Sequence, residues 1–356
     1  MSRFFSEKYA SLVPYVPGEQ PKKTKYIKLN TNESPFPPSP LAVELAAKAA
    51  EHLELYSDPE CRELVEAACE YYGVGKDEIL FTNGSDEILN FAFMAFCDRQ
   101  HPAVFPDITY GFYPVFADLN GVPYETIPLK EDFSLDASDY VGMGKTIFIA
   151  NPNAPTGLTI SLAEIERIVA SNPDNVVVID EAYVDFGGES AVPLIHKYDN
   201  LLVTQTFSKS RSMAGARLGM GFGCRGLIGD LNAIKYSTNP YNINSATMAA
   251  GVGALKDVAY FRKNCLEIAK TREWTREQLL SLGFRVTNSK ANFLFAAAPN
   301  YPGKDLYLDL KAKGILVRHF EPPRLKDFNR ITIGSQAQME ALIAAIKSLL
   351  AQGGSL

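Results

Sequence analysis

The amino-acid sequence predicts an α/β protein with a large domain built on a mainly parallel sheet and a smaller α+β lobe. Strand-like and helix-like segments alternate from about residue 40 to residue 250, as in chains that wind helices around a parallel sheet. Residues 176–179 (VVVI) form a continuous apolar run, which is typical of a strand buried on both faces. Towards the C-terminus, FRVTNSKANFLFAA, GILVRHF and NRITIG read as antiparallel strands, and QMEALIAAIKSLLA reads as an amphipathic closing helix.

The chain has 356 residues, more than one typical hydrophobic core holds, which favours two lobes. We predict an N-terminal arm over residues 1–37 that joins the small lobe, a large domain over 38–255 and a small C-terminal domain over 256–356. The arm holds five of the prolines and should be extended and irregular. Residues 261–282 should form the long helix that enters the small lobe.

Bulk charge and composition exclude several classes of function. The net charge of −6 argues against a nucleic-acid partner, which needs a basic face. No run of about 18 apolar residues is present, so we expect no membrane span, and the N-terminus lacks the apolar core of a signal peptide. The five cysteines are dispersed without CxxC spacing, which favours free thiols in a reducing cytoplasm over disulfides or a metal site.

The first helices and the first strong turn come next along the chain. Residues 40–53 and 61–72 have apolar residues at helical spacing, with Gly73 as a C-cap of the second helix. ILFTN is a short strand, NGSDE a tight turn and EILNFAFMAF an amphipathic helix. The turn contributes Gly84, the Ser85 hydroxyl and free N–H groups, which together make a natural phosphate cradle. Asp86 lies in the first helical turn, where a carboxylate also suits the helix dipole.

Three further strands end in polar or aromatic residues. Tyr110 follows HPAVFPDIT and could stack on a ring, although Phe112 or Tyr113 could pack into the core instead. TIFIA is a buried strand that enters the proline-rich loop containing Asn153. Asp180 ends the buried strand VVVID, at the edge where ligands bind in open α/β sheets, with a helix N-cap as the alternative role.

The segment TQTFSKSRSMAGARLGM places one lysine among hydroxyl groups and an arginine. Lys209 follows the buried strand LLVTQTF, where an ammonium group is costly unless it is paired or used covalently. An amine held there can lose its proton and form a Schiff base with a carbonyl. Thr206, Ser208 and Arg217 would suit a phosphate on the same ligand. Aldehyde and phosphate on one small molecule indicate pyridoxal 5'-phosphate (PLP).

PLP gives the other candidates definite roles. The Asp180 carboxylate is placed to pair with a protonated pyridine nitrogen and to keep the ring able to accept electrons when the substrate loses its α-proton. Tyr183, three residues further on, could hydrogen-bond the phenolic oxygen of the cofactor. Lys209, Asp180 and Tyr183 are therefore the predicted catalytic residues.

TFSKSRSMAGARLG resembles the lysine-attachment motif of fold-type-I PLP-dependent aminotransferases, and residues 12–333 as a whole resemble the histidinol-phosphate aminotransferases. LVPY-x-PG and LNTNESP resemble that family's N-terminal segments, in which the arm closes over the active site. This resemblance implies that Tyr15 helps hold the substrate phosphate. Asn32 and Glu33 occupy the family's Asn-Glu pair near the substrate entrance, without an assigned role.

The resemblance implies further contacts. Tyr56 would reach the cofactor phosphate of the partner subunit in a homodimer, the alternative being a tyrosine packed on its own domain. Arg330 and Arg318 would bind the substrate carboxylate or phosphate, although most arginines are simply solvated. The family often has Asn-Asn before PTG, where the second Asn contacts the cofactor oxygen. This chain reads Asn153-Ala154, so Asn153 is the candidate from one residue earlier.

The resemblance implies amino transfer between L-histidinol phosphate and 2-oxoglutarate, giving imidazole-acetol phosphate and glutamate, in histidine biosynthesis. Two related activities stay open: an aminotransferase for aromatic or other amino acids, and a PLP decarboxylase of the threonine-phosphate type. A PLP-binding regulator without catalysis is a third alternative, which the acidic balance and the absence of a recognisable DNA-binding domain disfavour.

Overall fold

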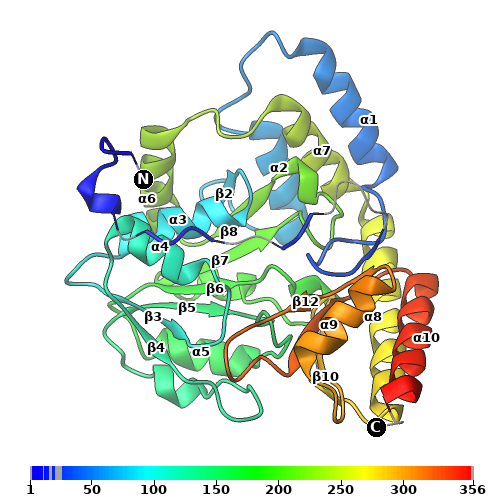
Figure 1. The fold of residues 1–356 in the computed structure, drawn as a ribbon. Helices are drawn as coiled ribbons and strands as arrows, with labels where there is room; N and C mark the ends of the chain where they lie inside the picture. Colours follow the sequence, from blue (N-terminus) through cyan, green and yellow to red (C-terminus); the bar gives the residue numbers. More distant parts are fainter. Residues whose placement is uncertain (1, 11, 16–17, 21–25, 354–356) are drawn as a thin grey trace.

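The computed structural model describes residues 2–10, 12–15, 18–20 and 26–353, and a seven-stranded sheet lies at the centre of its larger lobe (Figure 1). The strand order is β2-β8-β7-β6-β5-β3-β4. Only β8 runs against its neighbours, so the prediction of a mainly parallel sheet is confirmed. The strands are β2 (Ile79–Thr82), β3 (Ala103–Pro106), β4 (Tyr124–Ile127), β5 (Thr146–Ala150), β6 (Val177–Asp180), β7 (Leu201–Thr206) and β8 (Gly219–Phe222).

Helices cover both faces of this sheet because its central strands are apolar on both sides. Ile147 and Ile149 of β5 face one core, while Phe148 between them faces the other. Helices α3 (Ser85–Phe96), α4 (Tyr113–Asn120) and α6 (Arg225–Thr238) pack on the Phe148 side. Helices α1 (Pro40–Ala49), α2 (Arg62–Tyr72), α5 (Leu162–Ala170) and α7 (Ser245–Lys256) pack on the other side.

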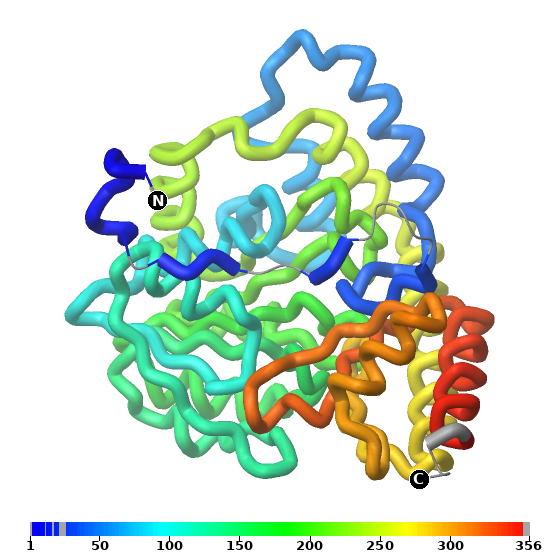
Figure 2. The backbone as a smooth tube through the Cα atoms, in the orientation of Figure 1, coloured from blue at the N-terminus to red at the C-terminus, as the bar shows by residue number. Residues whose placement is uncertain are grey.

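The smaller lobe has its own sheet and core. Its antiparallel strands follow the order β12-β13-β10-β9, with β9 (Arg285–Val286), β10 (Phe293–Ala297), β12 (Arg318–His319) and β13 (Phe328–Thr332). Helices α8 (Val258–Ser281), α9 (Gly303–Ala312) and α10 (Gln336–Gly353) complete it. Figure 2 shows the blue N-terminal segment reaching this orange and red part of the chain. There β1 (Ile27–Lys28) pairs in parallel with β11 (Ile315–Leu316), and Leu29 enters the core of the smaller lobe.

The structure also contains short 3₁₀ helices: η1 (Glu7–Tyr9), η2 (Ala50–His52), η3 (Ala137–Tyr140), η4 (Val184–Phe186), η5 (Val192–His196) and η6 (Ala214–Ala216). The predicted C-cap at Gly73 is confirmed, because this residue has a φ of 71° and its N–H donates to the carbonyl of Cys69. Strand β8 continues past Met220 to Phe222, with β2 on one side and β7 on the other.

Gly219 allows α3 to lie directly on β8. A Cβ atom at this position would lie 2.3 Å from the backbone nitrogen of Ser85, a contact that only a backbone shift relieves. We expect Gly219→Ala to lower the free energy of unfolding by about 1–3 kcal/mol in urea titrations, because overpacking forces such shifts. The matched control is Gly229→Ala in α6, where a Cβ meets open space. Equal stability of the two variants would contradict this close approach.

Candidate active site

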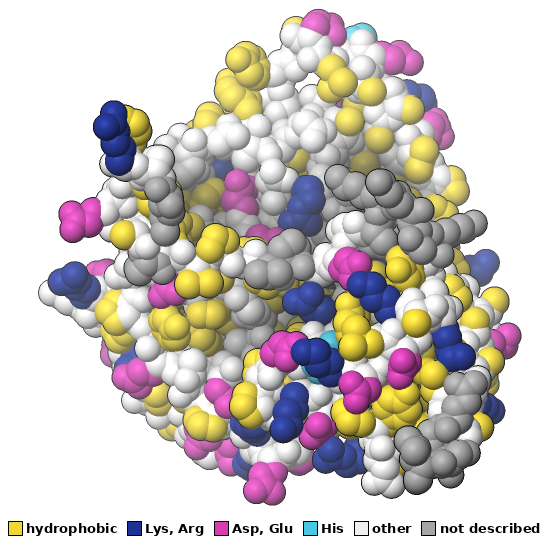
Figure 3. Space-filling view, viewed as in Figure 1, with side chains coloured by type: hydrophobic (Ala, Val, Ile, Leu, Met, Phe, Trp, Pro, Cys, Tyr) yellow, Lys and Arg dark blue, Asp and Glu magenta, His cyan; other side chains and the backbone are white. Residues whose placement is uncertain are grey.

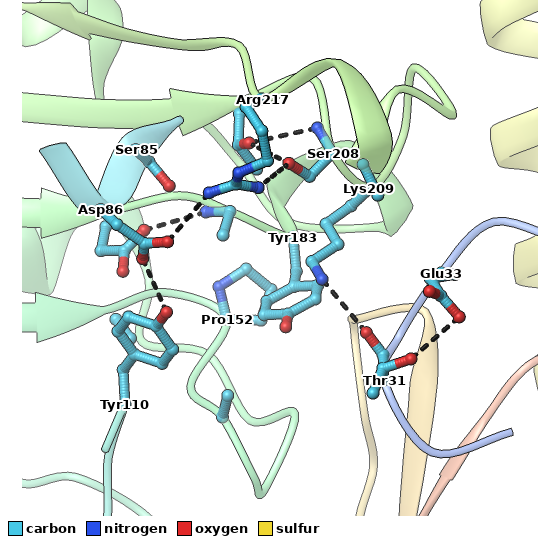
Figure 4. A pocket seen from close by; sticks show the side chains of 16 residues that line it. Thr31, Glu33, Ser85, Asp86, Tyr110, Pro152, Tyr183, Ser208, Lys209 and Arg217 are labelled. Atoms are coloured by element: carbon cyan, nitrogen blue, oxygen red, sulfur yellow. Dashed lines mark hydrogen bonds and ion pairs between the residues drawn. The ribbon is translucent and has the colours of Figure 1, made fainter. Parts of the chain in front are cut away.

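A pocket opens where the carboxyl ends of β5, β6 and β7 meet the start of α3, and Figure 3 shows this face of the molecule hollowed near its centre. The pocket encloses about 740 Å³, its open mouth included. Its walls come from distant parts of the sequence, which the fold brings together (Figure 4). The lining residues are Thr31, Glu33, Ser85, Asp86, Tyr110, Ala150, Pro152, Ala154, Asp180, Ala182, Tyr183, Thr206, Ser208, Lys209, Ala214 and Arg217.

Lys209 points into this pocket from the turn after β7, a strand that is buried along its whole length. Its Nζ donates a hydrogen bond to the backbone carbonyl of Thr31 at 3.3 Å and lies 5.8 Å from the centre of the Tyr183 ring. In the part of the chain that the structure describes, no salt bridge joins this Nζ to a carboxylate. A neutral carbonyl therefore holds the amine, which leaves it available for covalent chemistry.

Asp180 lies at the end of β6 and is buried. Its Oδ2 accepts a hydrogen bond from the Tyr113 hydroxyl at 3.1 Å, and its Oδ1 accepts from the Thr204 hydroxyl at 3.3 Å. Burial raises the pKa of Asp180 to about 6. The hydrogen bond from Tyr113 lowers this pKa, whereas the charge of Asp86 raises it. A cation placed against this carboxylate would restore its usual ionisation, so the site suits a protonated ring nitrogen.

Arg217 and the neighbouring hydroxyl groups form an anion cradle at the other end of the pocket. Arg217 Nη1 donates to Ser208 Oγ at 3.3 Å, and the Thr206 hydroxyl donates to the same oxygen at 3.0 Å. Arg217 Nη2 donates to Asp86 Oδ2 at 3.1 Å, so a carboxylate already contacts the guanidinium. Fork-shaped guanidinium donors and hydroxyl groups are the ligands that phosphate prefers.

Gly84 keeps this cradle open at the N-terminus of α3. It has a φ of 83°, which favours glycine, and a Cβ atom there would lie 2.4 Å from Arg217 Nη2. Ser85 begins α3, so the first backbone N–H groups of the helix are free to donate to an anion. Any other residue at position 84 would crowd the arginine, and the cradle therefore fits a phosphate group.

Tyr110 and Tyr183 line the middle of the pocket. The Tyr110 hydroxyl donates to Asp86 Oδ1 at 2.7 Å, and the Tyr183 hydroxyl accepts from Asn32 Nδ2 at 2.9 Å. Tyr113 is fully buried against Asp180, a contact that sequence reasoning did not identify. Among the large-lobe contacts predicted within one subunit, the structure thus brings together all except Asn153.

Asn153, the predicted contact to the cofactor oxygen, has protein partners in the structure. This residue is buried, but it does not line the pocket. Its Nδ2 donates to the carbonyl of Ile108 and to the hydroxyl of Thr156, both at 3.0 Å, so its amide fastens the proline-rich loop. Ala154 lines the pocket wall beside it, and the contact of Asn153 with the cofactor stays a prediction.

Arg318 and Arg330 lie directly opposite each other on β12 and β13, outside the pocket lining. Burial lowers the pKa of Arg330. The nearby Tyr183 and Tyr15 raise this pKa, whereas the charge of Arg318 lowers it further. Arg330 Nη2 donates to the carbonyl of Asn30 at 3.3 Å. Like charges directly across a strand pair repel each other, so this arrangement favours an anion between them.

The two tyrosines assigned by resemblance also lie outside the pocket lining. Tyr15 stacks on Phe112, with ring centres 4.2 Å apart, and a Cβ at Gly111 would lie 3.5 Å from its ring. Tyr56 is 85% exposed and stacks on Tyr241 at 4.7 Å, so its hydroxyl is open to a partner molecule. Neither position tests the predicted role of its residue.

Glu181 is buried behind the site and sets a pH dependence of stability. Its carboxylate accepts from the Ser190 hydroxyl, the Ala191 N–H and Gln205 Nε2. Burial nevertheless raises its pKa from 4.5 to about 7. At 1.36 kcal/mol per unit, this shift corresponds to about 3 kcal/mol. The folded state binds the proton more tightly than the unfolded state does, so this contribution is complete below pH 4.5 and is lost as the pH rises through 7.

We therefore expect Glu181→Gln to gain stability relative to the unmodified protein, by about 3 kcal/mol, as the pH rises from 4.5 to 8. Chemical denaturation of both proteins without added ligand at several pH values measures this difference. Glu51→Gln, at an exposed glutamate, is the control and should show no such trend. A constant difference between Glu181→Gln and the unmodified protein would contradict the raised pKa.

Comparison with known proteins decides the family. Residues 24–346 match the family model described as aminotransferase class I and II. The chain belongs to this family. It is a PLP-dependent transaminase with the fold-type-I α/β architecture, so the expected fold and cofactor are confirmed. The described residues contain no helix able to span a membrane and no cluster of three or more His, Cys, Asp or Glu able to hold a metal ion.

Several relatives of this aminotransferase carry one name. This chain is 49% identical to the histidinol-phosphate aminotransferase of Brachyspira hyodysenteriae, over 98% of this chain and 99% of that protein. It is 48% identical to histidinol-phosphate aminotransferase 1 of Bordetella parapertussis, with the same coverage. The crystal structure of histidinol-phosphate aminotransferase from Sinorhizobium meliloti in complex with pyridoxal-5'-phosphate has the same fold, with a TM-score of 0.88, 24% identity and coverage of 98% of this chain and 99% of that one.

Proposed function

We propose that this aminotransferase moves the amino group of L-histidinol phosphate to 2-oxoglutarate, giving imidazole-acetol phosphate and glutamate, as a cytoplasmic step of histidine biosynthesis. The names of full-length relatives at 48–49% identity support this substrate. Within the structure, the observation that carries the proposal is the Arg318–Arg330 pair opposed across β12 and β13. Two adjacent cations suit a phosphate dianion better than a single carboxylate.

The side chains of the pocket suit the phosphate and the ring nitrogen of PLP. Arg217, Ser208, Thr206, Ser85 and the free N–H groups at the start of α3 would bind the cofactor phosphate, in the space that Gly84 keeps open. Asp180 would bind the ring nitrogen at the opposite end of the pocket. When bound, PLP supplies an aldehyde that joins amines and a ring that accepts the electrons released at the substrate α-carbon.

Lys209 and the two pocket tyrosines would act on the reacting groups. The Lys209 amine would hold the cofactor and would move a proton to and from the carbon that bears the substrate amine. Asn32 holds the Tyr183 hydroxyl towards the pocket, where it would donate to the phenolic oxygen of the cofactor. Tyr110 is anchored by Asp86 at one pocket wall, where its ring would stack on the cofactor.

The substrate anion would bind beside the smaller lobe. Arg330 and Arg318 would hold either the phosphate of histidinol phosphate or the α-carboxylate of glutamate, with the Tyr15 hydroxyl as a further donor. The partial burial of Arg330 strengthens such a contact, because less water competes for the guanidinium. One anion site thus serves both substrates of the reaction.

The proposed enzyme is a homodimer in which Tyr56 contacts the partner subunit's cofactor phosphate. The 85% exposure of Tyr56 and the neighbouring exposure of Leu53 and Leu55 support this, because adjacent exposed apolar side chains mark interaction surfaces. Sedimentation velocity should give twice the 39.2 kDa chain mass. A monomer at working concentration that is fully active would refute this arrangement.

The direct test mixes the purified holoenzyme with histidinol phosphate and 2-oxoglutarate and follows glutamate. Phenylalanine and threonine phosphate serve as competing amino donors, with carbon dioxide release measured for the latter. We expect the highest kcat/KM with histidinol phosphate. A higher value with an aromatic amino acid, or carbon dioxide release as the main reaction, would replace the proposed function by one of these alternatives.

A further inference from the structure

Glu33 lines the same pocket as Lys209, but the proposed mechanism gives it no task. In Figure 4 it lies beyond Lys209 and Thr31, on the opposite side of the pocket from Asp86 and Tyr110. Its backbone position is fixed by the residue before it. The Asn32 N–H donates to the Thr332 hydroxyl at 2.9 Å, and the Asn32 carbonyl accepts from Asn292 Nδ2 at 3.0 Å. The smaller lobe therefore holds Glu33 at the pocket.

The Glu33 carboxylate is ionised, and only one of its two oxygens accepts hydrogen bonds from the described residues. Its Oε2 accepts hydrogen bonds from Lys28 Nζ and, at 2.9 Å, from the Thr31 hydroxyl. Among the residues that the structure describes, none donates to Oε1. Partial burial alone would raise the pKa of Glu33, but the bonds from Lys28 and Thr31 and the charges of Lys28 and Lys209 lower it below its usual value.

The other carboxylates of the pocket have both oxygens engaged. Asp86 accepts from Tyr110 with one oxygen and from Arg217 with the other. Asp180 accepts from Thr204 with one oxygen and from Tyr113 with the other. Of the three carboxylates in the described pocket lining, Glu33 alone offers an unengaged acceptor atom to a ligand.

We propose that Glu33 is a specificity-determining residue whose Oε1 accepts a hydrogen bond from the imidazole N–H of the substrate. This inference rests on the proposed function. With its phosphate at the paired arginines and its amine at Lys209, the substrate has one polar group left, the imidazole ring, which donates an N–H whether or not it carries a second proton. A carboxylate fixed at the pocket wall suits that donor and repels the side-chain carboxylate of glutamate.

The experiment measures the two half-reactions of the holoenzyme separately, by single-turnover absorbance of the bound cofactor with histidinol phosphate or with glutamate. A hydrogen bond to a charged group is worth about 10- to 100-fold in binding. We expect Glu33→Gln and Glu33→Ala to shift the ratio of the two kcat/KM values towards glutamate by about this factor. The bound cofactor spectrum before substrate addition confirms that each variant has folded.

Lys28→Met is the matched control, because it breaks the ion pair on Oε2 while keeping the Glu33 carboxylate. If Glu33 only fastens the segment around Thr31, both Glu33 variants and Lys28→Met will lower the two half-reactions in parallel. If the unmodified enzyme uses histidinol phosphate but the ratio of the two kcat/KM values is the same in Glu33→Gln and Glu33→Ala as in that enzyme, this inference alone is overturned. An unmodified enzyme that reacts with glutamate but not with histidinol phosphate overturns the proposed function and this inference together.

Discussion

Replacement of Lys209 by alanine should lower amino-transfer activity by at least about 10³-fold, because in the proposed mechanism one side chain both holds the cofactor and moves the proton. In the structure its Nζ is the amine that reaches the pocket, with the Thr31 carbonyl as its hydrogen-bond acceptor. Steady-state kinetics measure the loss. Borohydride reduction followed by peptide mass spectrometry should find the cofactor on the Lys209 peptide of the unmodified enzyme and on no peptide of the variant.

Lys48→Ala provides the control for this substitution. Lys48 is exposed on α1, where it pairs with Glu44, so its removal should leave both the activity and the covalent labelling intact. Covalent labelling that persists in Lys209→Ala would assign the attachment to another lysine. Near-normal turnover in that variant would refute the role of Lys209 altogether.

Asp180→Asn should lower kcat/KM by about 10²- to 10³-fold, the range found when one preorganised electrostatic contact is removed. Asparagine has nearly the same shape but no charge to keep a ring nitrogen protonated. In the cofactor-free protein the same substitution should be stabilising above about pH 6, because burial opposes the ionised Asp180. A loss of activity together with a gain in cofactor-free stability is the pattern of a residue that serves the ligand.

Kinetics and denaturation of the same Asp180→Asn preparation test both parts of this expectation. Asp230→Asn, on the exposed side of α6, is the control and should change neither quantity. Activity of Asp180→Asn within about threefold of the unmodified enzyme would show that the carboxylate does not control the ring nitrogen. Lower stability of the cofactor-free variant at pH 8 would contradict the unfavourable burial of its charge.

The sequence predicted the central fold well where apolar runs are long and turns are marked. The segments around residues 146–150, 177–180 and 201–206 are rich in β-branched and other apolar residues, and each is a strand in the structure. Strand β8 was missed because Gly219, Gly221 and Gly223 have the composition of a loop. Gly219 and Gly221 are small because α3 packs on them, as the 3.3 Å approach of Ile88 to a Cβ at Gly221 shows. Tertiary packing, not local preference, decides this strand.

Within the site, residue type alone could not assign neighbours. Tyr110, Phe112 and Tyr113 are close in sequence, and only the fold shows that Tyr113 contacts Asp180 while Tyr110 contacts Asp86. The side chain of Asn153 turns to Ile108 because the proline-rich loop needs its amide, which no spacing rule predicts. The unengaged oxygen of Glu33 depends on Lys28 and Thr31, whose side chains meet only once the backbone around residue 31 is in place.

The beginning of the chain is tied to its far end close to the lysine amine. The Leu29 N–H bonds to Leu316, the Leu29 carbonyl accepts from Thr332, and two residues later the Thr31 carbonyl meets Lys209. Any tilt of the smaller lobe away from the sheet must therefore pull this carbonyl off the nitrogen. The hydrogen bond between Thr31 and Lys209 therefore joins the segment held by the smaller lobe to the turn after β7. A deletion that ends before residue 26 should keep this hydrogen bond, whereas one that removes Thr31 should lose it.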